Sequence, residues 1–175
     1  QHKDNVVKQE SADVLLEKIK YVSKLVTVEG YFSELYNYKD YWKYDWWPFQ
    51  RKALIRVKAK VSAGYDLSQM KISADPKLKQ ITVSNLPKPQ ILSIDHDLDY
   101  YDISEGTFNS FTPEDYSRIS GNAKKIIIEK ANQSDLLAKA KAQGNQNIEM
   151  MRFIAESAGW TLKIDSTTVA PTPIK

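Results

Sequence analysis

The clearest hydrophobic pattern in the chain lies in residues 53–67, ALIRVKAKVSAGYDL, where apolar and polar positions alternate. A period of two places alternate side chains on opposite faces of a strand. Arg56, Lys58 and Lys60 share one face, so this face is predicted to be wet. The opposite face is predicted to lie on the core in a long antiparallel strand. It carries Ala53, Ile55, Val57, Ala59, Val61, Ala63 and Tyr65.

Shorter stretches predict strands on both sides of this one. Residues 24–35 are rich in β-branched and aromatic side chains, and residues 70–73, 79–87 and 160–165 have the same character. Residues 75–79, DPKLK, supply a turn signal. Residues 90–101 alternate again, and the side chains predicted to face the core there are Leu92, Ile94, His96, Leu98 and Tyr100.

Helical periodicity occurs at both ends of the sequence. A short helix is predicted after Ser11, a capping residue, with Leu15, Ile19 and Val22 on one face. A second helical region follows Thr112 and Pro113, which suit an N-cap and a first turn. Within this region Gly144 is predicted to kink or split the helix, and Gly159 to end it.

Strands first and helices last predict an α+β fold. The expected architecture is a twisted, mainly antiparallel sheet with a long C-terminal helix or helical hairpin. A chain of 175 residues suits one domain. We predict a single domain over residues 11–165, a disordered N-terminal segment over residues 1–10 and a flexible tail over residues 166–175.

Composition and motifs narrow the possible functions. A net charge of +3 is too small to indicate a nucleic-acid partner, and the absence of cysteine excludes disulfides and thiolate metal sites. No nucleophile elbow, zinc-binding HExxH or phosphate-binding glycine loop occurs. The sequence therefore favours a non-enzymatic protein without a cofactor, although it leaves enzymatic activity open.

Aromatic residues gather in residues 31–49, where ten of nineteen positions are aromatic. They can fill core positions, stack on sugars, or contact a membrane surface or a partner protein. Charged residues are interleaved with them, so one side is expected to stay wet. The candidate interaction surface consists of Tyr38, Tyr41, Trp42, Tyr44, Trp46 and Trp47.

Acidic residues gather in the next zone, residues 89–117, which holds seven carboxylates and no Lys or Arg. Asp95, Asp97 and Asp99 fit the start of a calcium loop, but Tyr100 occupies the position of the turn glycine and Gly106 that of the bidentate glutamate. These three aspartates are therefore only weak metal candidates. The alternative is that they face the basic strand or water.

Four short stretches, taken in order, resemble a bacterial family known only as a domain of unknown function, number forty-two thirty in that series. They are AGYDL (residues 63–67), LPKP (86–89), IL (91–92) and AESAGW (155–160). The resemblance implies an extracytoplasmic or membrane-tethered domain with no established catalytic residues. The order of elements is also similar to that of band-seven, or stomatin-like, domains in architecture alone. In structural terms Gly64, Pro87, Pro89 and Gly159 are interpreted as determinants of the fold.

The leading hypothesis is an envelope-associated, non-enzymatic interaction domain that uses the aromatic-rich hairpin as its contact surface. The expected partner is a protein or a membrane surface. A carbohydrate-binding module that uses the same rings is the first alternative. A hydrolase that uses a divalent metal on the three aspartates is the second.

Overall fold

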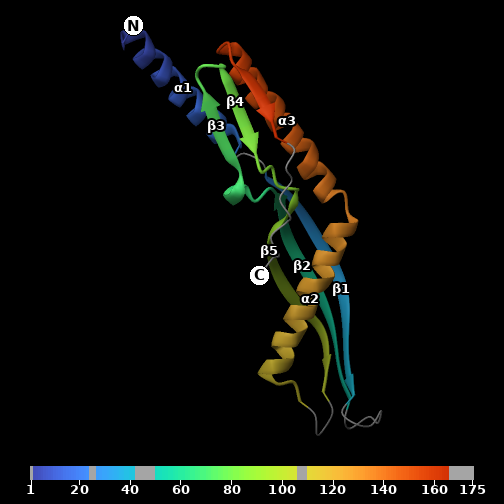
Figure 1. The fold of residues 1–175 in the computed structure, drawn as a ribbon. Coiled ribbons are helices and arrows are strands. Elements are labelled where there is room, and N and C mark those ends of the chain that lie inside the picture. The colour runs from blue at the N-terminus through green and yellow to red at the C-terminus, as the bar shows by residue number, and fades with distance from the viewer. Residues whose placement is uncertain (1, 24–26, 42–49, 106–109, 166–175) are drawn as a thin grey trace. The chain divides into compact units, whose positions relative to one another are not determined.

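The computed structural model describes residues 2–23, 27–41, 50–105 and 110–165, and its helices and strands make up an α+β fold, as predicted (Figure 1). The chain divides into two compact units. The first unit combines residues 1–28, 63–92 and 137–175, and the second combines residues 29–62 and 93–136. The assignment of residues 11–165 to a single domain, with flexible segments before and after it, stays a prediction.

The first unit is built around a small three-stranded sheet. Strand β4 (Gln80–Ser84) lies in the centre, antiparallel to β3 (Lys71–Asp75) and parallel to β6 (Thr161–Ile164). In this register Ile81 lies opposite Leu162, and Ile72 lies opposite Val83. The turn between β3 and β4 is held by the Asp75 carboxylate, which accepts hydrogen bonds from the backbone N–H groups of Lys77 and Leu78.

Helices α1 (His2–Ser23) and α3 (Leu136–Ser157) supply the rest of this unit's core. Leu15, Ile19 and Val22 are buried along one face of α1, as the periodicity predicted. Helix α1 begins at His2, so Ser11 lies inside the helix and is not its cap; residues 2–10 contain no Gly or Pro to prevent a helical turn. The buried apolar cluster consists of Ala12, Leu15, Ile19, Val22, Ile81, Val83, Met151, Ala155, Trp160 and Leu162.

The end of α3 is a Schellman motif. Gly159 has a φ of +76°, and its N–H donates to the carbonyl of Glu156, while the N–H of Trp160 donates to that of Ala155. The predicted helix stop at Gly159 is confirmed. The motif turns the chain so that Trp160 enters the core and β6 can follow at once.

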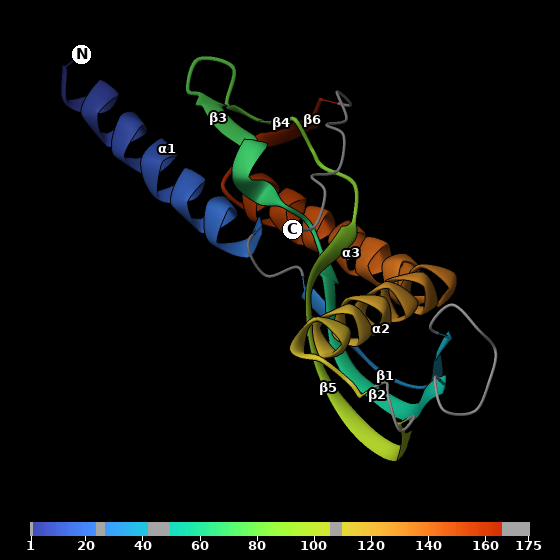
Figure 2. The ribbon, with the colours of Figure 1, turned by 90° about the horizontal axis from the view of Figure 1, so that it is seen from below.

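The second unit is a sheet covered by one helix. Strands β1 (Thr27–Tyr41), β2 (Gln50–Gly64) and β5 (Gln90–Ser104) form a sheet in the order β1-β2-β5. Figure 2 shows α2 (Pro113–Gln133) lying along one face of this curved sheet. The alternation predicted for β2 is confirmed, because Ile55, Val57 and Val61 are fully buried. Along α2 the buried apolar positions are Ile119, Ala123, Ile127 and Ala131, so small and large side chains alternate at the contact.

Helix α2 begins where the sequence predicted and ends where it did not. Thr112 and Asp115 form a reciprocal capping box, with Pro113 in the first turn. The helical region is interrupted at Ser134 and Asp135, whereas Gly144 lies inside α3, so the prediction of a split at Gly144 was wrong. Ser134 makes the break because its hydroxyl donates to the carbonyl of Ala131 and accepts from the N–H of Leu136.

Candidate functional site

The predicted aromatic surface falls mostly outside the described residues. Trp42, Tyr44, Trp46 and Trp47 lie there, and so does the side chain of Tyr41. Tyr38 is described and is buried in the second unit, with its ring centroid 5.8 Å from that of Phe111. The aromatic side chains of β1 therefore lie in different environments, because Tyr38 is a core residue whereas Tyr31 is 78% exposed.

The acidic strand β5 lies next to the basic strand β2 in the sheet. The sequence allowed two interpretations of the aspartates, a metal site or pairing with this basic strand. The Asp99 carboxylate lies 2.9 Å from the Arg56 guanidinium and 2.9 Å from the Lys58 ammonium. Hydrogen bonds from Lys58 and then Arg56 lower the pKa of Asp99. Asp95 and Asp97 are exposed. Among the described residues, no group of three His, Asp or Glu side chains is arranged to hold a metal ion.

His96 lies at the margin of the second unit's core, as its place in the alternation predicted. The ring is half-buried, and Nε2 lies 3.1 Å from the hydroxyl of Ser120 on α2. This contact gives Nε2 a partner within the second unit, so packing accounts for the position of His96.

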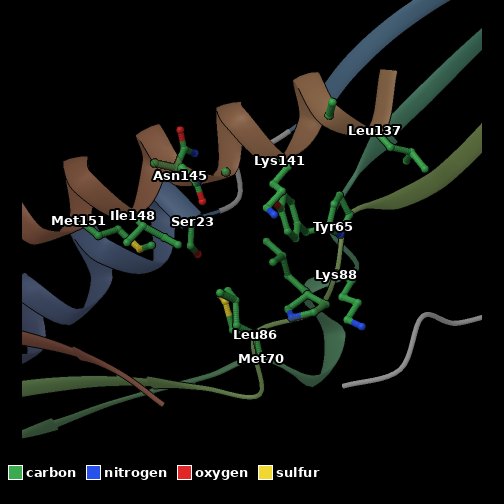
Figure 3. A pocket seen from close by; sticks show the side chains of 16 residues that line it. Ser23, Tyr65, Met70, Leu86, Lys88, Leu137, Lys141, Asn145, Ile148 and Met151 are labelled. Atoms are coloured by element: carbon green, nitrogen blue, oxygen red, sulfur yellow. The ribbon is translucent and has the colours of Figure 1, made fainter. Parts of the chain in front are cut away.

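Among the described residues, a pocket within the first unit offers a concave site (Figure 3). Its volume of about 580 Å³ is within the range that holds small organic ligands. The wall is mainly apolar and includes Leu67, Met70, Leu86, Ile148 and Met151. In Figure 3, Ile148 and Met151 lie on one side of the cavity, and Tyr65 and Lys141 lie on the other.

The segments that line this pocket are each fixed by local interactions. After β2, Asp66 caps a short 3₁₀ turn, η2 (Leu67–Gln69), by accepting from the N–H of Ser68, and this turn positions Leu67 and Met70. After β4, Asn85 has a φ of +57°, and Pro87 and Pro89 keep the following corner extended. These are backbone constraints, so this part of the wall is preformed.

The helical side of the pocket is fixed by two buried polar contacts. The side-chain amide of Asn147 on α3 donates to the carbonyl of Val22 at 3.0 Å, which joins α3 to the end of α1. The hydroxyl of Ser23, which lines the pocket, donates to the carbonyl of Lys20 at 2.8 Å. These contacts use the Asn147 amide N–H and the Ser23 O–H within the protein, so they fix this part of the wall.

Gly144 allows the pocket to have its shape. A Cβ added at this position would lie 2.5 Å from the Tyr65 hydroxyl oxygen and 2.6 Å from Tyr65 Cε2, closer than real Cβ contacts. The ring of Tyr65 therefore packs directly on the backbone of α3. Burial raises the pKa of Tyr65, so its hydroxyl stays protonated at neutral pH and can donate a hydrogen bond.

Part of this pocket lies in two short stretches that stand out in the sequence. Tyr65 and Leu67 belong to AGYDL, and Leu86, Pro87, Lys88 and Pro89 are LPKP. Both stretches were interpreted as determinants of the fold. One feature of the sequence could have indicated a site. Each stretch combines residues that constrain the backbone with a side chain that has no part in that constraint, such as Tyr65 after Gly64.

None of the helices that the structure describes combines the length and the apolar character needed to cross a membrane. No curated protein and no solved structure matches the chain. A family model described as "Protein of unknown function (DUF4230)" matches residues 17–165, which include every described residue that lines the pocket. The chain therefore belongs to the DUF4230 family, the family that the four short stretches indicated.

Proposed function

We propose that this protein is a non-enzymatic binding domain whose first unit holds an apolar small molecule in the pocket between α1, α3 and the β4–β5 corner. The observation that carries the proposal is the pocket's mainly apolar wall around a volume of about 580 Å³. Ligand sites of this kind bury most of the ligand and use a few polar groups to orient it. Here the polar groups are Tyr65 and Lys141.

A neutral fluorescent probe, N-phenyl-1-naphthylamine, tests this proposal. We expect a saturable rise in its fluorescence with the full chain, because its emission increases in an apolar environment. Met70→Trp should weaken the binding at least about tenfold, because the larger ring occupies the cavity. Met150→Trp is the matched control, since Met150 lies on α3 outside the pocket wall and is 51% exposed. Equal binding by both folded variants would contradict the proposal.

A contact surface on the aromatic-rich hairpin is the second candidate function. It is supported by the edge strand β1, which leads into residues 42–49. On β1 the side chain of Tyr31 is 78% exposed and that of Leu35 is 66% exposed. Exposed rings at a strand edge are typical of surfaces that contact a partner or a membrane interface. In this proposal the protein works at the cell envelope, tethered to the membrane or outside the cytoplasm.

Liposome flotation tests the membrane form of the second candidate. We expect the wild-type chain to float with vesicles, and a variant with Trp42, Trp46 and Trp47 changed to Ser to stay in the lower fractions. If the folded variant floats as the wild type does, the rings are not the membrane contact. Binding to a glycan array that is lost in the same variant would favour the carbohydrate alternative instead.

A further inference from the structure

The charges at the pocket are all of one sign. The residues that line it include Lys88 and Lys141 and no Asp or Glu. Within the described part of the chain, neither ammonium group is in an ion pair, and the Tyr65 hydroxyl has no hydrogen-bond partner. Asp66, the carboxylate nearest in sequence to Tyr65, does not line the pocket and accepts from the N–H of Ser68.

The two lysines differ in direction. In Figure 3 the side chain of Lys141 reaches from α3 toward the ring of Tyr65, whereas that of Lys88 points away from the cavity. Lys141 precedes Gly144 by almost one helical turn, and Tyr65 packs on Gly144. The Lys141 ammonium group and the Tyr65 hydroxyl group can therefore both donate hydrogen bonds to the same group of a ligand on this side of the cavity.

The opposite side of the cavity carries no charged side chain. Ile148 and Met151 lie there beside Ser23 and Asn145, and Met70 and Leu86 add to the wall between the two ends. A ligand that satisfies both sides needs an anionic head and a hydrocarbon tail. A neutral ligand leaves the Lys141 charge without compensation, and a cationic one meets repulsion from a site with no carboxylate.

We infer that the pocket binds a single-chain anionic amphiphile, with its carboxylate or phosphate head on Lys141 and Tyr65 and its tail against Ile148 and Met151. This inference rests on the proposed function, because it names the class of ligand for the same pocket. The head accepts hydrogen bonds from the ammonium and phenol groups, and no covalent step is involved. Charge-assisted hydrogen bonds of this kind are stronger than neutral ones, so the head contributes to selectivity.

Displacement of N-phenyl-1-naphthylamine from the full chain tests the head and the tail separately. The competitors, used below their micelle concentrations, are laurate, dodecyl phosphate, dodecyltrimethylammonium and acetate. We expect laurate or dodecyl phosphate to displace the probe at least about tenfold better than the cation with the same tail. Acetate should fail, because it lacks the tail. The tighter of the two anions identifies the head as carboxylate or phosphate.

Variants assign the head to its residues. Lys141→Met should weaken binding of the anion about tenfold relative to that of the neutral probe, whose own affinity is measured for each variant. Lys88→Met is the matched control and should change neither by more than about twofold, since its ammonium points out of the cavity. Lys141→Glu should invert the preference in favour of the cation.

Two outcomes separate this inference from the proposal beneath it. If the neutral probe does not bind, both fail. If the probe binds but the anion and the cation compete equally, or if Lys141→Met leaves the ratio of their affinities unchanged, the pocket is a ligand site and the inference of an anionic ligand is overturned.

Discussion

The buried ion pair of the second unit contrasts with the lysine at the pocket of the first unit. In the second unit Arg51 and Asp115 are buried together as an ion pair, and Asp99 is shared by Arg56 and Lys58. In the first unit Lys141 stands at an apolar cavity whose described lining contains no carboxylate. A charge that the protein itself compensates holds the fold together. A charge beside a cavity that the protein leaves uncompensated is available to a ligand.

The largest effect is expected from breaking the buried pair. Asp115→Ala leaves Arg51 buried without its carboxylate and removes the side chain that caps α2 together with Thr112. We expect a loss of roughly 2–4 kcal/mol in the free energy of unfolding, measured by urea titration. Lys141→Met is the comparison variant and should unfold within ~0.5 kcal/mol of wild type. If the two variants lose similar amounts of unfolding free energy, the Arg51–Asp115 pair is no more important to the fold than Lys141 is.

Acid should weaken the same pair. A hydrogen bond from the backbone of Thr112 is the largest cause that lowers the pKa of Asp115, and bonds from the Thr112 hydroxyl and Arg51 add to it. A lowered folded-state pKa contributes stability above the unfolded value of about 4, and this stability is lost as the pH falls through the folded-state pKa. Urea midpoints measured from pH 7 to pH 3 should therefore fall, and less steeply for Asp115→Asn. Parallel curves would show that other groups dominate the acid response.

Two helical glycines allow the units to be compared by the same substitution. Gly121 on α2 has nothing within 4 Å of an added Cβ, so Gly121→Ala should stabilise the protein by about 0.5–1 kcal/mol. Gly144→Ala should gain less or lose stability, because its Cβ displaces Tyr65. It should also weaken the binding of N-phenyl-1-naphthylamine, which Gly121→Ala leaves unchanged. Equal gains at the two positions would mean that Tyr65 does not depend on Gly144.

The smallest effect is expected from divalent cations. Asp99 is already held by Arg56 and Lys58, so calcium or magnesium at millimolar concentration should leave the melting temperature unchanged. The metal-dependent hydrolase predicts the contrary, a rise in melting temperature that Asp99→Asn abolishes. Thermal unfolding with and without the ions decides between them.

Local patterns were the part of the fold that the sequence could predict. The alternation from Ala53 to Ala63, the capping box at Thr112 and the helix stop at Gly159 each depend on residues within a few positions of one another. The interruption at Ser134 was missed because a serine hydroxyl can either cap a helix or face solvent, and the choice depends on packing. Gly144 was misjudged for the same reason, since its role lies in a contact with Tyr65.

The pocket could not be predicted because it depends on contacts between distant segments. Its wall joins Ser23, residues 65–89 and residues 137–151, and no local pattern states that these segments meet. Asn147 shows the difficulty: in the sequence it is one polar residue in a polar helix, whereas in the fold its amide is buried on the carbonyl of Val22. The proposed aromatic surface remains a prediction at Trp42, Trp46 and Trp47.

The parallel pairing of β6 with β4 sets an order for folding during synthesis. All residues of the second unit lie between positions 29 and 136, so they leave the ribosome before α3 and β6, which complete the first unit. At roughly 5–20 residues per second, the remaining segment takes seconds to appear, longer than small sheets and helices need to form. The buried face of α1 can pack early on Ile81 and Val83, whereas Met151 and Trp160 reach the same cluster only after α3 is made. In the nascent chain, the first unit is therefore the last to be completed.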